Sequence, residues 1–193
     1  MPVLNVYPDG SVSRTYGYSE LMNPELLGFI KRFLSTRFAG GSIYSWIPTS
    51  EDHMVLFFKD STCMEVSFMF QFKLIENVFY LYSIASAPGQ YRIPGFARKC
   101  LINWISSRQS HYMSLGISID SSLQELERLS TLYSGLGFNN PTPSNSVGPY
   151  YYPTPQIKLT RTPDTPVDSP KNTSSIQNIM NLVRSLRKTH KIE

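Results

Sequence analysis

Residues 84–105 constrain the fold more than any other part of this 193-residue sequence. Apolar and small residues up to Pro88 are typical of a strand, and a short loop, residues 90–97, opens directly into an amphipathic helix. A second alternating stretch, residues 112–120, predicts another strand after that helix. A strand, a helix and a strand in this order form a crossover unit, so we expect the two strands to run parallel in one sheet.

The segments before this unit predict a hairpin and a helix. Residues 3–18 alternate weakly around a Pro-Asp-Gly turn and predict a short edge hairpin. Asn23 is the expected cap of a helix with Pro24 at its first position, and residues 39–41 are expected to end it. Residues 42–52 fit either a long surface loop or a short second helix.

Strands dominate the middle of the chain, and the pattern becomes irregular near its end. Three β-rich runs joined by tight turns predict an antiparallel meander: residues 54–60, 63–74 and 78–85. A helix is expected from residue 121 to about 135, then an irregular proline- and tyrosine-rich segment at 139–155 and a last strand at 156–161. We therefore expect an α/β fold with a mixed, mostly antiparallel sheet of six or seven strands, flanked by helices and followed by a C-terminal tail.

Composition divides the chain into a domain and a tail. We expect a globular domain at 1–160, a flexible Pro/Thr/Ser/Asp linker at 161–175 and a basic amphipathic helix at 176–193. The formal net charge is +4, and residues 161–193 hold six Lys/Arg against three Asp/Glu, so the domain itself is nearly neutral. A dedicated nucleic-acid-binding domain is therefore disfavoured. The tail helix can bind a partner groove, an anionic membrane surface or nucleic acid, or dock back on the domain.

Several classes of protein and site are not supported by the sequence. Cys63 and Cys100 are expected to be buried as small hydrophobes, and the three histidines show no spacing that would complete a metal site. The sequence lacks an apolar run of about 18 residues, so no transmembrane segment is predicted. The first ten residues have neither the basic start nor the apolar core of a secretory signal, so we expect a cytoplasmic protein.

The loop before the crossover helix has the chemistry of an anion site. Gly95 allows close approach of the backbone, and the start of a helix supplies unpaired N–H groups and the positive end of its dipole. The N–H groups expected to converge on the anion belong to Arg92, Ile93, Gly95, Phe96 and Ala97. Pro94 has no N–H and removes one donor. Neither a Walker loop nor a dinucleotide-binding fingerprint is present, and an ordinary strand-to-helix turn is the alternative.

Two motifs narrow the identity of the anion. Residues 92–97 read Arg-x-x-Gly-x-Ala, and residues 132–138 read Leu-Tyr-x-x-x-Gly-Phe. In this order, with a helix and a strand between them, they resemble the GNAT superfamily of acetyl-CoA-dependent N-acetyltransferases over residues 54–138. The resemblance implies an open sheet whose fourth and fifth strands part to hold acetyl-CoA. Leu126 and Leu129 depart from the asparagine and alanine that the family often carries.

The resemblance implies an N-acetyltransferase that moves an acetyl group from acetyl-CoA directly to an amine on a small molecule or a protein. Tyr133 would protonate the departing CoA thiolate, although by itself it also fits a core aromatic. Asp120 and Glu65 are candidate bases, and each also fits a solvated or capping carboxylate. The residues expected to contact acetyl-CoA are Ile84, Ala85, Ser86, Ala87, Arg92, Ile93, Gly95, Phe96 and Ala97.

A competing class of function is a catalytically inactive binding protein that keeps the GNAT fold. Such a protein would use the basic helix at 176–193 to contact a protein or an anionic surface, and either class can form a homodimer. Direct transfer of the acetyl group is favoured for the enzyme because neither Cys63 nor Cys100 falls where an activated nucleophile would be expected.

Overall fold

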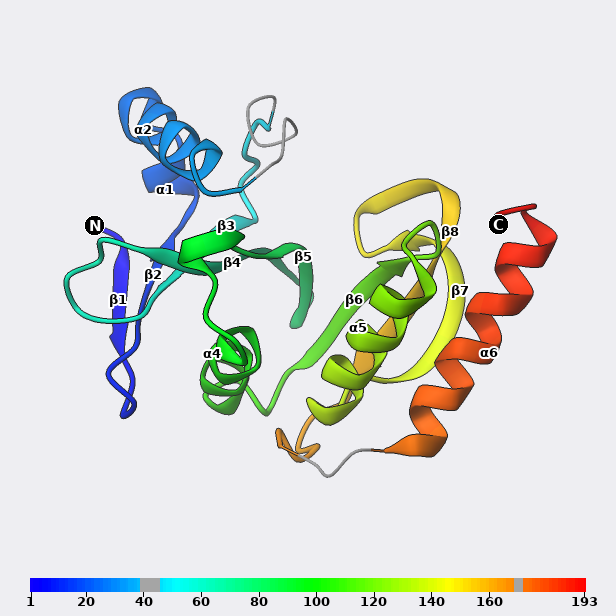
Figure 1. The fold of residues 1–193 in the computed structure, drawn as a ribbon. Helices are drawn as coiled ribbons and strands as arrows, with labels where there is room; N and C mark the ends of the chain where they lie inside the picture. The colour runs from blue at the N-terminus through cyan, green and yellow to red at the C-terminus, as the bar shows by residue number, and fades with distance from the viewer. Residues whose placement is uncertain (39–45, 169–171) are drawn as a thin grey trace. The chain divides into compact units, whose positions relative to one another are not determined.

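The computed structural model describes residues 1–38, 46–168 and 172–193 (Figure 1). The strands are β1 (Val3–Val6), β2 (Val12–Tyr16), β3 (Asp52–Phe58), β4 (Val66–Ile75), β5 (Val78–Ser86), β6 (Tyr112–Ser118), β7 (Asn139–Val147) and β8 (Tyr150–Arg161). The helices are α1 (Tyr18–Leu21), α2 (Pro24–Ser35), the 3-10 turn η1 (Gly89–Tyr91), α4 (Phe96–Ser106), α5 (Leu123–Gly135) and α6 (Thr173–Thr189).

The strands form one mixed sheet with the hydrogen-bonded order β1-β2-β3-β4-β5-β6-β8-β7. The pairs of β1 with β2, β2 with β3, β3 with β4, β6 with β8 and β7 with β8 are antiparallel. β5 and β6 are parallel, with Val78–Tyr80 beside Tyr112–Ser114. The predicted α/β class, the mostly antiparallel sheet and the parallel crossover pair are confirmed. The predicted strand number is wrong, because the described sheet has eight strands rather than six or seven.

The two additional strand segments lie where an irregular segment was predicted. Residues 139–155 form β7 and the start of β8, a hairpin with Asn139 opposite Thr160 and Val147 opposite Tyr150. β7 is the edge of the sheet, where prolines such as Pro143 are tolerated. The register shifts between Ser144 and Ser146, so the prolines at 153 and 155 fall at an irregularity of the pairing.

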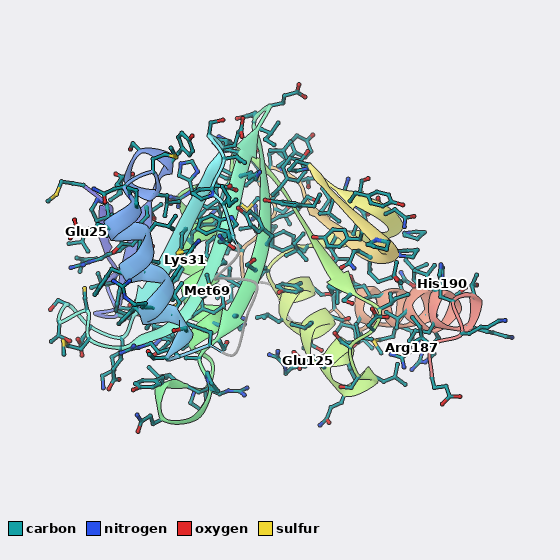
Figure 2. All side chains as sticks on the ribbon, turned by 90° about the horizontal axis from the view of Figure 1, so that it is seen from above. Glu25, Lys31, Met69, Glu125, Arg187 and His190 are labelled. Atoms are coloured by element: carbon teal, nitrogen blue, oxygen red, sulfur yellow. The ribbon has the colours of Figure 1, made fainter. Side chains whose placement is uncertain are left out.

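Contacts divide the chain into two compact units, residues 1–75 with 81–103 and residues 76–80 with 104–193. In the first unit, α1 and α2 pack on one face of β3 and β4, and Figure 2 labels Met69 of β4 and Glu25 and Lys31 of α2. The buried cluster there includes Leu21, Ile30, Leu34, Met54, Leu56, Phe58, Val66 and Met69. This cluster provides the core of the first unit.

The start of α2 agrees with the prediction from sequence. The Asn23 side chain accepts hydrogen bonds from the N–H groups of Glu25 and Leu26, at 3.0 and 3.1 Å, and Pro24 opens the helix. The helix ends at Ser35, and the predicted terminator at 39–41 lies outside the described residues. Residues 42–45 of the predicted loop or short helix at 42–52 also lie outside them, and the described residues 46–51 form a loop without a helix before β3 begins at Asp52.

In the second unit, α6 packs against α5 and β7 (Figure 1). Ile179 and Val183 of α6 are fully buried, so the tail helix docks back through its apolar face. Of the residues between β8 and α6 that are described, Asp164 is held by a hydrogen bond from its N–H to the carbonyl of Gln109, at 2.8 Å. The predicted division at 160 and 175 stays a prediction. Within the described ranges, none of the helices has the length and apolar character needed to cross a membrane.

Candidate functional site

The loop between β5 and α4 is exposed and has two glycines in left-handed conformations. Gly89 begins η1 with φ +60°, and Gly95 precedes α4 with φ +73°. A Cβ built on either glycine would meet nothing within 4 Å. The backbone at Gly95 therefore faces open space, which leaves room for an anion at the start of α4.

Fewer loop N–H groups are available than the sequence predicted. The N–H of Arg92 donates to the carbonyl of Gly89 and that of Phe96 to the carbonyl of Ile93, both at 3.1 Å. The expectation that these two donors are free is therefore wrong, because the loop folds into a 3-10 turn and a second tight turn that use them internally. The N–H groups of Ile93, Gly95 and Ala97 have no acceptor among the described residues. Three donors at a helix N-terminus still suit an anion.

Arg37, two residues after the end of α2 at Ser35, contacts the loop through the ring of Tyr91. Its guanidinium lies 3.9 Å from the ring centroid of Phe33 and 4.9 Å from that of Tyr91. It also donates to the carbonyl of Met64 at 3.2 Å. Sequence reasoning missed this residue, although side chains spaced four residues apart, as Phe33 and Arg37 are, can stack where a helix ends. Because Tyr91 belongs to η1, the stacking ties the loop to α2.

Residues 84–87, at the end of β5 and just after it, end in the buried Ala87, and Ser83 before them has an unusual backbone conformation. Ile84 and Ala85 are half-buried, Ser86 is exposed, and Ala87 is buried. The Ala87 N–H donates to the Ser67 carbonyl at 3.0 Å, so it is already used by the protein. Ser83 has φ +51°, a left-handed value that is uncommon for serine and that no sequence pattern here indicates.

Tyr133 lies in the second unit, on the buried face of α5. Its side chain is 4% exposed, and its ring meets Phe138 edge-on with centroids 6.1 Å apart. The α5 helix starts at a Ser122 cap that accepts from the N–H of Glu125 at 3.2 Å. Burial raises the pKa of the Tyr133 phenol well above its ordinary value, although the nearby Arg128 works against this. The phenol is neutral at physiological pH, as a general acid must be, and the raised pKa makes it a weaker acid than a free tyrosine.

Asp120 lies in the turn after β6 rather than at the end of a strand. The strand ends at Ser118, and the Asp120 N–H donates to the Ser118 hydroxyl at 3.2 Å. The carboxylate is exposed. An exposed carboxylate in such a turn fits the solvated alternative as well as a base.

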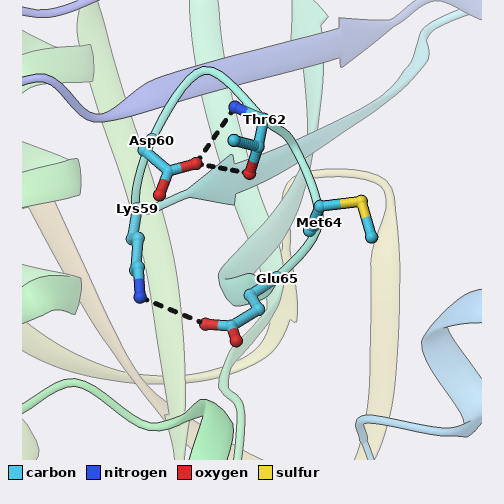
Figure 3. Close-up of a pocket in the computed structure, with 5 residues that line it drawn as sticks. All are labelled: Lys59, Asp60, Thr62, Met64 and Glu65. Atoms are coloured by element: carbon cyan, nitrogen blue, oxygen red, sulfur yellow. Dashed lines mark hydrogen bonds and ion pairs between the residues drawn. The ribbon is translucent and has the colours of Figure 1, made fainter.

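Glu65 also lies outside a strand, because β4 begins only at Val66. Cys63 has φ +55°, which interrupts the extended chain that the sequence predicted from this point. The Glu65 carboxylate lies 3.7 Å from the Lys59 ammonium and is 43% exposed. It lines a surface hollow of about 120 Å³ together with Lys59, Asp60, Thr62 and Met64 (Figure 3). A carboxylate paired in this way has no feature that favours proton abstraction.

Metal and thiol chemistry find little support in the described ranges. No group of three or more His, Cys, Asp and Glu side chains there could hold a metal ion. Cys100 is fully buried in α4, and burial raises the pKa of its thiol, so the reactive thiolate is disfavoured.

Comparison with known proteins identifies a fold rather than a close relative. No protein-family model and no curated protein sequence matches the chain. A GNAT-family acetyltransferase from Bacteroides thetaiotaomicron matches with a TM-score of 0.50 and 12% identity, covering 91% of this chain and 96% of its own.

Two further solved structures have lower TM-scores. The ribosomal-protein-S18-alanine N-acetyltransferase from Escherichia coli has a TM-score of 0.49 at 15% identity and covers 83% of this chain and 97% of its own. A histone acetyltransferase HPA2-related protein from Corynebacterium glutamicum has a TM-score of 0.48 at 16% identity, and the match covers 86% of this chain and 98% of its own. Identities this low bear on the fold alone. With the sheet order and the Bacteroides match, the predicted fold is confirmed: the chain has the fold of the GNAT acetyltransferases.

Proposed function

We propose that this protein is an N-acetyltransferase that transfers an acetyl group from acetyl-CoA directly to an amine. The observation that carries the proposal is the exposed loop at Gly95, where a left-handed glycine faces open space at the N-terminus of α4. Such a loop suits the pyrophosphate of CoA because backbone donors and the helix dipole both favour a doubly charged anion. The acceptor, a small molecule or a protein, and a cytoplasmic location are parts of the same proposal.

Each part of the chain has a defined task in this reaction. The N–H groups of Ile93, Gly95 and Ala97 bind the pyrophosphate, and the backbone of residues 84–87 holds the pantetheine arm. Acetyl-CoA supplies a thioester carbonyl that the acceptor amine attacks. Tyr133 donates its phenolic proton to the departing thiolate, and the proton that the amine nitrogen loses returns to the phenolate through solvent. The phenol is protonated at neutral pH, as this role requires, while burial makes it a weaker acid than a free tyrosine.

Calorimetric titration with acetyl-CoA tests the proposal most directly. We expect saturable binding in the wild type and none in Gly95→Glu, because the new carboxylate fills the anion site with negative charge. Absence of heat at millimolar acetyl-CoA in the wild type would refute the proposal. The Gly95→Glu protein must keep the circular dichroism spectrum of the wild type for its loss of binding to count.

The role of Tyr133 is tested separately by Tyr133→Phe. With primary amines as acceptors and free CoA as the detected product, turnover should fall about 100-fold, within the range for loss of a general acid. Acetyl-CoA affinity should remain nearly unchanged, because the ring is retained. Unchanged turnover would assign Tyr133 to the core of α5 alone.

A catalytically inactive binding protein of the same fold is the second candidate. It is favoured by the smaller donor set of the loop, in which two N–H groups are used internally and Pro94 supplies none. Calorimetry distinguishes the two candidates, because only the enzyme requires acetyl-CoA to bind. A homodimer, or a partner of the basic tail, would be compatible with either candidate.

A further inference from the structure

β5 contains one residue more than a regular strand would need. Tyr82 reaches Asp52 of β3, and Ala85 packs in the cluster that includes Met54, two residues after Asp52 on the same strand. Asp52 and Met54 share a face because side chains alternate along a strand. Tyr82 and Ala85 therefore lie on one face although three positions separate them, which a regular strand does not allow.

Ser83 is the extra residue. It stands directly after Tyr82, and its φ of +51° is where the chain leaves the extended conformation. One inserted residue with an unusual backbone conformation is a β-bulge, which bends a strand and changes which face later side chains occupy. Serine has no intrinsic preference for this conformation, so the surroundings must stabilise it.

A buried polar network holds the side chain next to the bulge. The Tyr82 hydroxyl donates to one carboxylate oxygen of Asp52, a residue that is 1% exposed. The other oxygen accepts from the Thr49 N–H at 2.6 Å and the Thr49 hydroxyl at 3.1 Å. The Lys73 ammonium lies 3.5 Å from Asp52 and donates to the Thr49 hydroxyl at 2.9 Å.

This network resists displacement of Tyr82. A buried carboxylate is stable only when its charge is paired and its oxygens accept hydrogen bonds, so loss of the Tyr82 donor would leave Asp52 less well satisfied. Lys73 stands directly opposite Asp52 in the pairing of β3 with β4, so two strands fix the position of the carboxylate. Tyr82 is in this way tied to the paired strands β3 and β4 of the first unit.

We propose that Asp52, Thr49 and Lys73 form an anchor for Tyr82 that fixes the Ser83 bulge and so positions the backbone of residues 84–87 for acyl-CoA. The role for acyl-CoA rests on the proposed function, whereas the anchoring of the bulge does not. Tyr82 is a positioning residue, since it acts through the strand backbone.

Hydrogen–deuterium exchange on the full chain tests the anchor. Tyr82→Phe removes only the hydroxyl that reaches Asp52, and Tyr80→Phe makes the same chemical change two residues earlier on β5. We expect amides of residues 83–87 to exchange about tenfold faster in Tyr82→Phe than in the wild type, the lower end for a bond to a charged group. The Ala87 amide, bonded to the Ser67 carbonyl, is the best reporter. Exchange in the β1–β2 hairpin and in α6 should not change.

Acetyl-CoA titrations of the same three proteins test the positioning role. Affinity should fall about tenfold in Tyr82→Phe and stay the same in Tyr80→Phe. Equal exchange at residues 83–87 in both variants would overturn the anchor, as would an increase spread evenly over the chain. Faster local exchange with unchanged affinity would overturn the positioning role. If the wild type fails to bind acetyl-CoA, the proposed function and the positioning role both fall, and the exchange comparison alone decides on the anchor.

Discussion

Alanine at Gly95 and alanine at Gly10 form a matched pair that tests the loop. Both glycines lie in the first unit with left-handed backbones, φ +73° and +85°, and at both a Cβ would meet nothing within 4 Å. The cost of either substitution is therefore the backbone strain of an L-residue without a steric clash, about 1–2 kcal/mol. Urea denaturation should show that the free energy of unfolding falls by nearly the same amount in the two variants.

The two variants should differ in acetyl-CoA affinity although they lose similar stability. In Gly95→Ala the new methyl group occupies the space where the backbone would meet the pyrophosphate, so acetyl-CoA affinity should fall about 10- to 100-fold, or roughly 1.4–3 kcal/mol. Gly10 lies in the β1–β2 turn, and its variant should bind acetyl-CoA as the wild type does. Equal affinities in the two variants would refute the assignment of the loop. A much larger loss of stability at Gly95 than at Gly10 would refute the absence of a clash.

Three further experiments give distinct outcomes. Because burial raises the pKa of Tyr133, the folded protein holds this proton when the unfolded chain releases it, so the free energy of unfolding should fall as pH rises above about 10. Tyr133→Phe should remove about one proton's worth of that slope in urea titrations from pH 8 to 11. Gly137→Ala should cost about 2–4 kcal/mol, more than Gly10→Ala, because its Cβ would stand 2.8 Å from Thr165 in addition to the strain at φ +88°. Asp52→Asn should cost about 3 kcal/mol by removing the charge beside the buried Lys73 ammonium, and adding Lys73→Met should recover part of it, as equilibrium unfolding can check.

Local sequence patterns predicted the elements whose signals are local. The Asn23 cap with Pro24 placed the start of α2, and alternation with tight turns placed the meander of β3 to β5. The hairpin of β7 and β8 was missed because its prolines argue against a strand in general. They are tolerated at a sheet edge and at register shifts, and both depend on which strands become neighbours.

In the candidate site too, some features could be predicted from local sequence and others could not. Gly95 could be recognised from its place between a predicted strand and a predicted helix, and its left-handed φ agrees with the need for glycine there. The bulge at Ser83 could not be recognised, since serine is common in regular strands and the group that stabilises the bulge, Asp52, is 31 positions away in sequence. The internal use of the Arg92 and Phe96 N–H groups was equally hidden, because it depends on the turn that the loop adopts.

The helix α6 was predicted from its own sequence, but the surface on which it packs was not. Its apolar stripe predicted an amphipathic helix. That stripe packs on a face of α5 that includes small residues: Ser130 is fully buried, and its hydroxyl lies 3.9 Å from the Met180 sulfur. Arg187, labelled in Figure 2, donates to the carbonyls of Ile119 and Ser121 at 3.1 and 2.7 Å. One basic side chain of the tail thus fixes the turn after β6 rather than facing solvent. Because the apolar stripe is covered, a partner of the tail would have to bind its exposed charged face, which includes Arg184 and Lys188, and this interaction would weaken as salt rises.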